Sequence, residues 1–204
     1  MAYRVAVLGA TGNVGREILS SLAERQFPIK KIYAVASSSS LGRQVSFGDT
    51  DTLTVESLEN FDFSKVDLVF SSVGSRVIKQ FAPKITGAGA LLIDNSSAFR
   101  RDPDIPLVVP EINREALSLA RRKNIIASPN CIAVPLAVAL KPLSQLAKIK
   151  RIVVSTYQAT SGAGYAAMDE LFRQTRAIFV NDPIEKENFT KQIAFNAIPH
   201  IGYF

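Results

Sequence analysis

Short apolar runs alternate with amphipathic stretches along the first two thirds of the chain. The runs predicted to be strands lie at residues 4–8, 31–36, 66–71 and 90–94. Helical patterns follow the first run to about Glu24 and the third run to about Ile85. Strands that alternate with helices across short loops are typical of a parallel sheet with helices on both faces. The pattern therefore predicts an α/β fold with a doubly wound parallel sheet, whose ligands bind at the carboxyl ends of the strands.

Further elements are expected between and beyond these strands. They are small strands and a turn within 47–64, a strand at 107–109, a turn at 110–113, a helix at 114–122, a buried strand at 125–127, a buried helix at 132–147, a longer alternating strand at 151–158 and a helix from about 165 to 176. Pro142 is expected to kink its helix. After it, the alternation of short apolar runs and helical patterns gives way to a longer alternating segment and a small-residue loop. This change indicates a second domain after the doubly wound sheet.

Composition narrows the class of protein. Hydrophobic residues make up 47% of the chain and charged residues 21%, as in a globular protein with a sizeable core. No apolar run is long enough for a membrane span, and no signal peptide is expected before the first strand. A single cysteine excludes an internal disulfide framework and suits a reducing cytoplasm, and one cysteine with one histidine argues against a zinc site.

The net charge of +6 points to phosphorylated ligands more than to nucleic acid. Basic residues are scattered, apart from short clusters at 121–123 and 148–151, and the aromatic residues are not interleaved with them. The basic and aromatic surface of a nucleic-acid-binding protein is therefore not expected.

A glycine turn joins the first strand to the first helix. Gly9, Gly12 and Gly15 form a G-x-x-G-x-x-G pattern that places backbone N–H groups at a helix N-terminus, where a pyrophosphate binds. The pattern predicts a dinucleotide site in a Rossmann-type sheet, and its alternative is a tight turn without a ligand. The second strand ends in four serines, Ser37–Ser40, with no acidic residue before Asp49.

The adenosine ribose is expected beside these serines. NAD usually meets an acidic residue at this position, so the serine run favours NADP, with Arg43 as a possible phosphate partner. The alternative is a flexible surface loop of serines.

Cys131 follows a short apolar run and a Ser128-Pro129-Asn130 turn, and it precedes the apolar helix. Asn130 is a natural N-cap, so the thiol is expected at a helix N-terminus, which favours the thiolate. The helix terminus contributes about 0.3–1 kcal/mol, or about 2 kcal/mol when partly buried, so it lowers the thiol pKa by little more than one unit from about 8.5. A reactive Cys131 therefore needs a partner base. The alternative is a small buried hydrophobic residue.

Three other positions are candidates for ligand contacts. Arg100 leaves the carboxyl end of the strand at 90–94 and offers a planar fork to a carboxylate or phosphate; the alternative is a solvated surface arginine. Gln158 ends the predicted strand at 151–158, where it can orient a substrate oxygen. The small residues Ser161, Gly162 and Gly164 would let a flat ring approach the backbone.

Several separated motifs together resemble aspartate-semialdehyde dehydrogenase from Val5 to His200. They are GATGNVG at 9–15, NSSAFR at 95–100, VPEIN at 109–113, SPNC at 128–131 and STYQATSGAG at 155–164. The resemblance implies NADP-dependent reductive dephosphorylation of L-aspartyl 4-phosphate to L-aspartate 4-semialdehyde, on the route to lysine, methionine and threonine. It also implies a dinucleotide-binding domain at 1–131 and an incomplete α+β catalytic and dimerisation domain at 132–204.

The resemblance also implies roles for individual residues. Cys131 matches the nucleophile that forms a thioester, Gln158 the substrate-orienting glutamine and Arg100 the arginine that holds phosphate. The cofactor-binding residues are expected to be Gly9, Thr11, Gly12, Asn13, Val14, Ser39, Ser40, Ser161 and Gly162. The family often has an arginine where this chain has Ser39, which weakens the case for NADP.

Members of that family continue well past the position of Phe204, and the further stretch carries the acid/base histidine. His200 matches a different position and is expected to serve packing. From these features we expect little turnover by 204 residues alone, and self-association through apolar surface that the short second domain leaves uncovered. The alternatives are a related acyl-phosphate reductase, such as an N-acetyl-glutamyl-phosphate reductase or a glyceraldehyde-phosphate type enzyme, and a non-catalytic nucleotide-binding or interaction protein.

Overall fold

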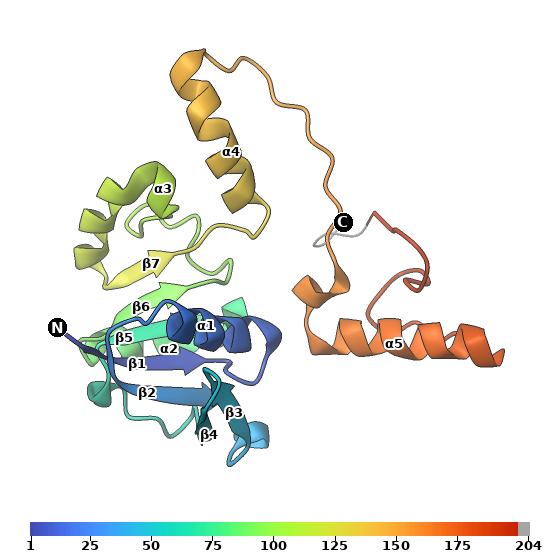
Figure 1. The fold of residues 1–204 in the computed structure, drawn as a ribbon, viewed down its shortest axis with the longest axis horizontal. Coiled ribbons are helices and arrows are strands. Elements are labelled where there is room, and N and C mark those ends of the chain that lie inside the picture. The colour runs from blue at the N-terminus through green and yellow to red at the C-terminus, as the bar shows by residue number, and fades with distance from the viewer. Residues whose placement is uncertain (200–204) are drawn as a thin grey trace. The chain divides into compact units, whose positions relative to one another are not determined.

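A computed structural model describes residues 1–199 of the chain. The chain divides into two compact units, Met1–Ile152 and Val153–Phe204, and each is described by itself. The first unit contains a sheet with helices on both faces (Figure 1). This arrangement confirms the doubly wound α/β fold that the hydrophobic pattern predicted.

Seven strands form the sheet of the first unit. They are β1 (Tyr3–Leu8), β2 (Ile29–Ala36), β3 (Gln44–Phe47), β4 (Asp51–Ser57), β5 (Leu68–Ser71), β6 (Leu91–Asp94) and β7 (Ile125–Ala127). Their order is β3-β4-β2-β1-β5-β6-β7, and every neighbouring pair is parallel except β3 with β4. Since the chain moves from β1 to one side and later returns to its other side at β5, the sheet has a topological switch point between these strands.

The helical elements of the first unit connect these strands. They are α1 (Asn13–Glu24), α2 (Ser75–Gly87), α3 (Pro110–Asn113) and α4 (Ala133–Leu146), with 3₁₀ turns η1 (Ser38–Ser40), η2 (Phe63–Lys65) and η3 (Arg114–Arg122). Val5 and Val7 pack into a buried cluster with Leu19 of α1, whereas Leu8 packs into a second cluster with Ile78 of α2. Successive residues of a strand point to opposite faces, so Val5–Leu8 of β1 are apolar and buried on both faces, with α1 packed on one face and α2 on the other.

The strand expected at Leu107–Val109 is wrong. The segment forms only an isolated bridge between Leu107 and Ala127, in which Val108 N donates to the Ala127 carbonyl and Ala127 N donates to the Pro106 carbonyl. Proline flanks the segment at 106 and 110 and has no N–H to donate, so the ladder cannot extend in either direction. Residues 110–113, expected as a turn, form the one-turn helix α3.

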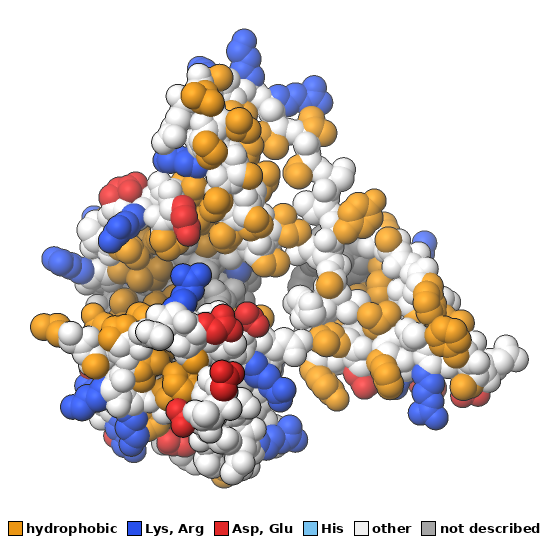
Figure 2. All heavy atoms as spheres, viewed as in Figure 1, with side chains coloured by type: hydrophobic (Ala, Val, Ile, Leu, Met, Phe, Trp, Pro, Cys, Tyr) orange, Lys and Arg blue, Asp and Glu red, His pale blue; other side chains and the backbone are white. Residues whose placement is uncertain are grey.

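The helix after Cys131 was predicted correctly, but its burial was not. Helix α4 contains no buried residue, and Leu143 and Leu146 are strongly exposed. Hydrophobic side chains are visible along α4 at the top of Figure 2. The sequence of α4 therefore favours a helix, but no described element of the first unit covers most of the surface of α4.

The strand expected at Arg151–Gln158 is also wrong. These residues carry no strand assignment and are all exposed. Alternation of apolar and polar residues becomes a strand only when a neighbouring strand supplies hydrogen-bond partners, and none of the described residues does so for this segment.

The second unit is organised by α5 (Tyr165–Val180), which follows the 3₁₀ turn η4 (Thr160–Ala163). Helix α5 continues past the expected end at Arg176 to an Asn181 cap with φ of 60°. Among the described residues of this unit the buried ones are Ala167, Glu170, Gln174 and Ala194. Two of these four residues are polar. The segment after α5 is therefore held against the helix mainly by side-chain hydrogen bonds and less by an apolar core.

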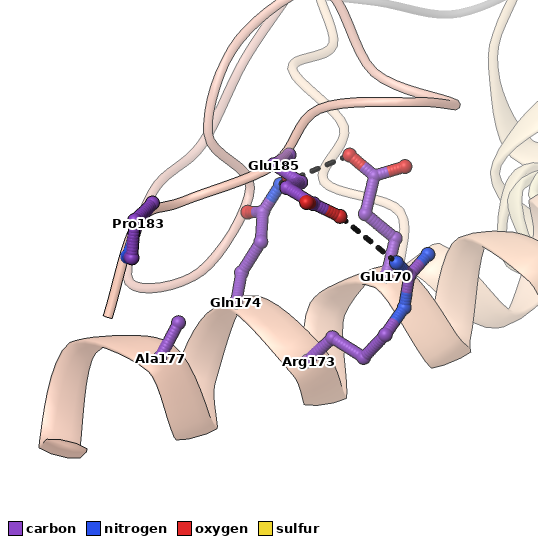
Figure 3. A pocket seen from close by; sticks show the side chains of 6 residues that line it. All are labelled: Glu170, Arg173, Gln174, Ala177, Pro183 and Glu185. Atoms are coloured by element: carbon purple, nitrogen blue, oxygen red, sulfur yellow. Dashed lines mark hydrogen bonds and ion pairs between the residues drawn. The ribbon is translucent and has the colours of Figure 1, made fainter. Parts of the chain in front are cut away.

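Glu170 and Gln174 make those hydrogen bonds (Figure 3). Gln174 Nε2 donates to Glu170 Oε1 at 2.9 Å, and Gln174 Oε1 accepts the Ile193 and Ala194 N–H groups at 2.8 and 3.1 Å. Glu170 Oε2 accepts from the Asn188 backbone N–H and side chain. Gln174 Oε1 and Glu170 Oε2 thus restrain the returning chain, while the bond between the two side chains satisfies their other buried polar atoms.

An ion pair at the start of the sheet gives a pH dependence. Arg4 donates to both carboxylate oxygens of Asp67, and these bonds lower the pKa of Asp67 to about 2. A lowered pKa means that the folded state favours the carboxylate, so this contribution to stability is present above about pH 4 and is lost toward pH 2. In Asp67→Asn, we expect the difference in melting temperature from the wild type to shrink as the pH falls from 6 to 2. A difference that does not change with pH, measured at low salt because the pair is partly exposed, would contradict this expectation.

Candidate functional site

The glycine turn after β1 brings the backbone of the chain close to itself. Gly9 has φ of 78°, and its N–H donates to the Val35 carbonyl at 2.8 Å. A Cβ atom at Gly9 would lie 2.7 Å from Ser72 Oγ, and one at Gly15 would overlap the Gly9 carbonyl. Gly9 is required by its positive φ and by the approach of Ser72, and Gly15 is required because the first turn of α1 touches the backbone of Gly9 and Ala10. This is the concave, backbone-lined turn that a pyrophosphate can approach.

Helix α1 begins at this turn without a capping side chain. Its N-cap is Gly12, whose N–H donates to the Gly9 carbonyl at 2.9 Å. Asn13 and Val14, the first helical residues, are exposed, and Thr11 is half-buried. The predicted residues Gly9, Thr11, Gly12, Asn13 and Val14 therefore lie together at one helix N-terminus, on the carboxyl edge of the sheet.

The next strand along this edge contributes a second turn of the same kind. Ser72 follows β5, and its hydroxyl donates to the Leu8 carbonyl at 2.8 Å, which joins the two turns at the switch point. Gly74 caps α2 without a side-chain hydrogen bond. Sequence reasoning did not single out Ser72, because its contact with Leu8 depends on the pairing of β1 with β5.

The serine run at the end of β2 forms a 3₁₀ turn, and its hydroxyls do not all face solvent. Ser39 is exposed and its hydroxyl lies 2.9 Å from that of Ser37, whereas Ser40 is buried. An acidic residue also reaches this turn. The pKa of Glu59 is lowered by a hydrogen bond from the Ser57 hydroxyl and by bonds from backbone N–H groups, including that of Ser38.

Sequence reasoning missed Glu59, because the residue enters from the loop after β4. The pairing of β4 with β2 places it beside the serine turn, although 19 or more residues separate it from that turn in the sequence.

Cys131 lies between β7 and α4, as predicted. Asn130 Oδ1 accepts the Ile132 N–H at 3.0 Å, and the Asn130 carbonyl accepts the Ala133 N–H at 2.9 Å, so Asn130 shapes the turn before α4. The N-cap of α4 is Ile132, without a side-chain hydrogen bond, so the prediction that Asn130 is the N-cap is wrong. The Cys131 side chain is exposed, and its sulfur lies 3.8 Å from Asn130 Oδ1. Exposure contradicts the alternative of a buried hydrophobic cysteine and leaves the sulfur open to a ligand.

Arg100 connects the loops after β6 and β7. Its Nε donates to the Ser128 carbonyl at 2.8 Å, and Nη2 donates to the Asn95 carbonyl at 2.7 Å. The side chain is half-buried, so it is not the fully solvated arginine of the alternative interpretation. These two bonds fix the plane of the guanidinium against Ser128, which lies three residues before Cys131, and leave Nη1 to donate to a ligand.

Asp94, at the end of β6, lies behind this loop. It is fully buried, and its Oδ2 accepts from the Ser96 hydroxyl at 2.7 Å. Its Oδ1 and the hydroxyl of the register neighbour Ser71 are buried without a hydrogen-bond partner among the described residues. Sequence reasoning did not single out either residue, because both lie within apolar strand patterns.

The remaining predicted site residues belong to the second unit or lie outside the description. Gln158, Ser161 and Gly162 are exposed residues of the second unit, in and before η4. His200 lies outside the described residues. Their expected roles stay predictions.

Metal sites and membrane spans can be assessed for residues 1–199. Within that range, no group of three or more His, Cys, Asp or Glu side chains is placed to hold a metal ion. Nor is any helix there both long and apolar enough to cross a membrane.

Two family models match the chain. Residues 4–120 match the semialdehyde dehydrogenase NAD-binding domain, and residues 140–204 match the semialdehyde dehydrogenase dimerisation domain. The first match covers more than half of the chain and includes the glycine turn, the serine turn and Arg100.

Individual relatives agree with these models. An aspartate-semialdehyde dehydrogenase of Rickettsia conorii is 56% identical over 200 residues, which are 98% of this chain and 59% of that protein. The structure of aspartate semialdehyde dehydrogenase II from Vibrio cholerae complexed with ASA has a TM-score of 0.95 at 45% identity, over 100% of this chain and 60% of that one. A Candida albicans aspartate semialdehyde dehydrogenase with NADP has a TM-score of 0.57 at 28% identity, over 72% of this chain and 48% of that one.

The chain thus spans about three fifths of the length of the curated relatives it matches. Its glycine turn, its switch point and its cysteine turn all fall within the part that is shared. On the family models and on this shared architecture, the chain belongs to the semialdehyde dehydrogenase family.

Proposed function

We propose that this chain serves the NADP-dependent reductive dephosphorylation of L-aspartyl 4-phosphate to L-aspartate 4-semialdehyde. One observation carries the proposal: the glycine turn, which has no side-chain cap, and the exposed Cys131 lie at the same edge of the sheet. The turn follows β1 and Cys131 follows β7, three strand positions away in the sheet order. At about 4.8 Å per strand this is a separation of about 14 Å. A dinucleotide bound by its pyrophosphate at α1 would therefore extend its nicotinamide toward Cys131.

Nucleophilic attack, phosphate binding and substrate orientation each have a candidate residue. The Cys131 thiolate would attack the acyl carbon of the substrate, which forms the carbon–sulfur bond of a thioester and breaks the carbon–oxygen bond to phosphate. Arg100 Nη1 would hold the departing phosphate with charge-assisted hydrogen bonds. Bound NADPH would supply the hydride that reduces the thioester to the aldehyde and returns the sulfur as thiolate. Gln158 would orient the substrate, and Ser161 and Gly162 would contact the nicotinamide end of the cofactor.

The cofactor fits the turn on structural grounds. Gly9 and Gly15 leave no room for a Cβ, so the backbone itself lines the turn, and Gly12 leaves the helix end without a side-chain cap. An anion can use such a helix end without displacing a protein group. Asn13 and Val14 would hold the pyrophosphate through backbone N–H groups, and Ser39 would bind the ribose 2′-phosphate, with the buried Ser40 shaping the turn.

The experiment that tests the function compares three aldehydes. Purified full chain is supplied with NADP, inorganic phosphate and either aspartate semialdehyde, N-acetylglutamate semialdehyde or glyceraldehyde 3-phosphate, and the appearance of NADPH is followed. The proposal expects the highest kcat/KM with aspartate semialdehyde. A higher value with another aldehyde would support the corresponding acyl-phosphate reductase. Because little turnover is expected from these 204 residues, a non-catalytic nucleotide-binding protein is instead indicated if NADP binds but none of the three aldehydes slows the alkylation of Cys131 by iodoacetamide.

The preference between NADP and NAD gives a prediction for Glu59. An ionised carboxylate beside the serine turn repels a 2′-phosphate and can accept a hydrogen bond from a ribose hydroxyl, as acidic residues at this position do for NAD. In Glu59→Gln we expect the ratio of kcat/KM for NADP to that for NAD to rise by about threefold to tenfold, a small effect because Glu59 is exposed.

The matched control is Asp51→Asn, which removes an equal charge at the opposite end of β4. The same rise in both variants would show a general charge effect, and no rise in Glu59→Gln would show that Glu59 does not face the 2′-phosphate.

We further propose that the chain forms a homodimer or a higher homo-oligomer and works in the cytoplasm. The dimerisation-domain model over residues 140–204 supports self-association, as does the exposure of Leu143, Leu146, Phe172 and Phe179 on α4 and α5. The cytoplasmic location is supported by the single cysteine, which needs reducing conditions to stay a thiol.

A further inference from the structure

Asp94 is a buried carboxylate without a buried cation beside it. Its side chain is fully buried at the carboxyl end of β6, and no ion pair of the described residues includes it. Burial of a carboxylate is unfavourable unless hydrogen bonds compensate it. The hydrogen bond it accepts through its side chain comes from the Ser96 hydroxyl at 2.7 Å, while Oδ1 has no partner within residues 1–199. The side-chain hydrogen bond of Asp94 therefore goes to Ser96, in the loop that carries Arg100.

That loop is held by a connected set of hydrogen bonds. Ser96 Oγ donates to Asp94 and accepts the Ala98 N–H at 3.0 Å, which closes the turn two residues before Arg100. Arg100 then donates back to the Asn95 carbonyl and across to the Ser128 carbonyl. The Ser128 N–H in turn donates to the Asp94 carbonyl at 2.8 Å. Asp94 thus lies at the point where the Arg100 loop and the Cys131 turn are both attached to the sheet.

We propose that Asp94 is the positioning residue of the phosphate site: its carboxylate fixes the Asn95–Arg100 loop through Ser96, so that the Arg100 guanidinium is held for a phosphate group beside Cys131. The proposal rests on the proposed function of Arg100. Asp94 acts as a hydrogen-bond acceptor and not through its charge, since a negative charge behind the site opposes the binding of an anion. An acceptor of the same shape can therefore replace it.

The test uses the full chain and inorganic phosphate as the probe. Two quantities are measured: the KM for phosphate in the oxidation of aspartate semialdehyde, and the phosphate concentration that halves the rate of Cys131 alkylation by iodoacetamide. The second needs no turnover and reports one site, because Cys131 is the only cysteine. The variants are Asp94→Ala, Asp94→Asn, Ser96→Ala and Arg100→Ala, with the dissociation constant of NADP as the control for the fold.

We expect Asp94→Ala to raise both phosphate quantities about tenfold to a hundredfold, because a displaced guanidinium loses its aligned hydrogen bonds. Asp94→Asn should stay within about threefold of the wild type, since its amide oxygen can accept from Ser96. The dissociation constant of NADP should stay within about twofold in both variants, because the glycine turn belongs to β1 and α1. If Asp94→Ala does not fold, Ser96→Ala tests the same connection without altering the buried carboxylate.

Different results would overturn different parts of the assignment. If Arg100→Ala raises the phosphate quantities and neither Asp94→Ala nor Ser96→Ala does, Asp94 does not position the loop. If Asp94→Asn behaves like Asp94→Ala, the carboxylate acts through its charge and the hydrogen-bond account is wrong. If Arg100→Ala leaves phosphate binding unchanged, the proposed role of Arg100 fails, and the inference about Asp94 fails with it.

Discussion

Cys131→Ser is expected to lower kcat by at least about a thousandfold while the protein stays folded. A serine hydroxyl at this position lacks the nucleophilicity of a thiolate, and loss of a nucleophile removes the covalent route altogether. The side chain is exposed, so its replacement should change the free energy of unfolding by no more than about 0.5 kcal/mol. Steady-state NADPH formation and thermal unfolding measure the two effects.

The single cysteine supplies the control for this prediction. A thiol reagent should label the wild type once and Cys131→Ser not at all, and labelling should abolish activity in proportion to its extent. The dissociation constant of NADP should be similar in the wild type and the variant, since the glycine turn is untouched. A variant that retains kcat within about tenfold of the wild type would contradict covalent catalysis at Cys131.

Gly15→Ala should remove cofactor binding and destabilise the first unit. The added Cβ would overlap the Gly9 carbonyl oxygen and lie 2.7 Å from the Gly9 carbonyl carbon and 2.8 Å from Ala10 Cα. These are backbone atoms of the turn, so the turn must move. We expect the free energy of unfolding to fall by about 1–3 kcal/mol and the dissociation constant of NADP to rise at least about tenfold. Urea unfolding and fluorescence titration with NADPH measure these quantities.

Gly87→Ala is the matched control for this substitution. Gly87 is exposed at the end of α2, and a Cβ there meets no atom within 4 Å. Its replacement should leave NADP binding unchanged and keep or slightly raise the stability, because alanine is the better helix former. If Gly15→Ala binds NADP as tightly as Gly87→Ala does, the turn does not form the pyrophosphate site.

Local patterns predicted the sheet well, because the central strands are apolar over their whole length. The run at 4–8 became β1, and the helix expected to end at about Glu24 became α1 with that end. Where the prediction failed, the missing information was a partner. Residues 151–158 alternate like a strand but find no neighbouring strand among the described residues, and α4 is apolar but largely uncovered.

The candidate site divides in the same way. The glycine turn and the cysteine turn could be recognised from sequence, because a turn and the helix that follows it are built from consecutive residues. Glu59 and Asp94 could not, since each acts through residues that strand pairing brings to it. Glu59 meets the serine turn through the pairing of β2 with β4, and Asp94 meets the cysteine turn through the pairing of β6 with β7.

The sequence alone determined the order of the elements from β1 to α2 that build the central sheet, the backbone-lined turn at Gly9–Gly15 and the location of Cys131 just before a helix. These features depend on side-chain size, periodicity and the conformational freedom of glycine, all of which act over a few neighbouring residues. Only the tertiary structure decided that Arg100 is fixed by two carbonyl groups and that a buried carboxylate anchors its loop. The bond from Arg100 to the Ser128 carbonyl joins residues 28 positions apart, so it exists only once β6 and β7 have paired. The bonds from Ser96 to Asp94 and from Arg100 to Asn95 are local, and they become a buried anchor only when the sheet covers Asp94.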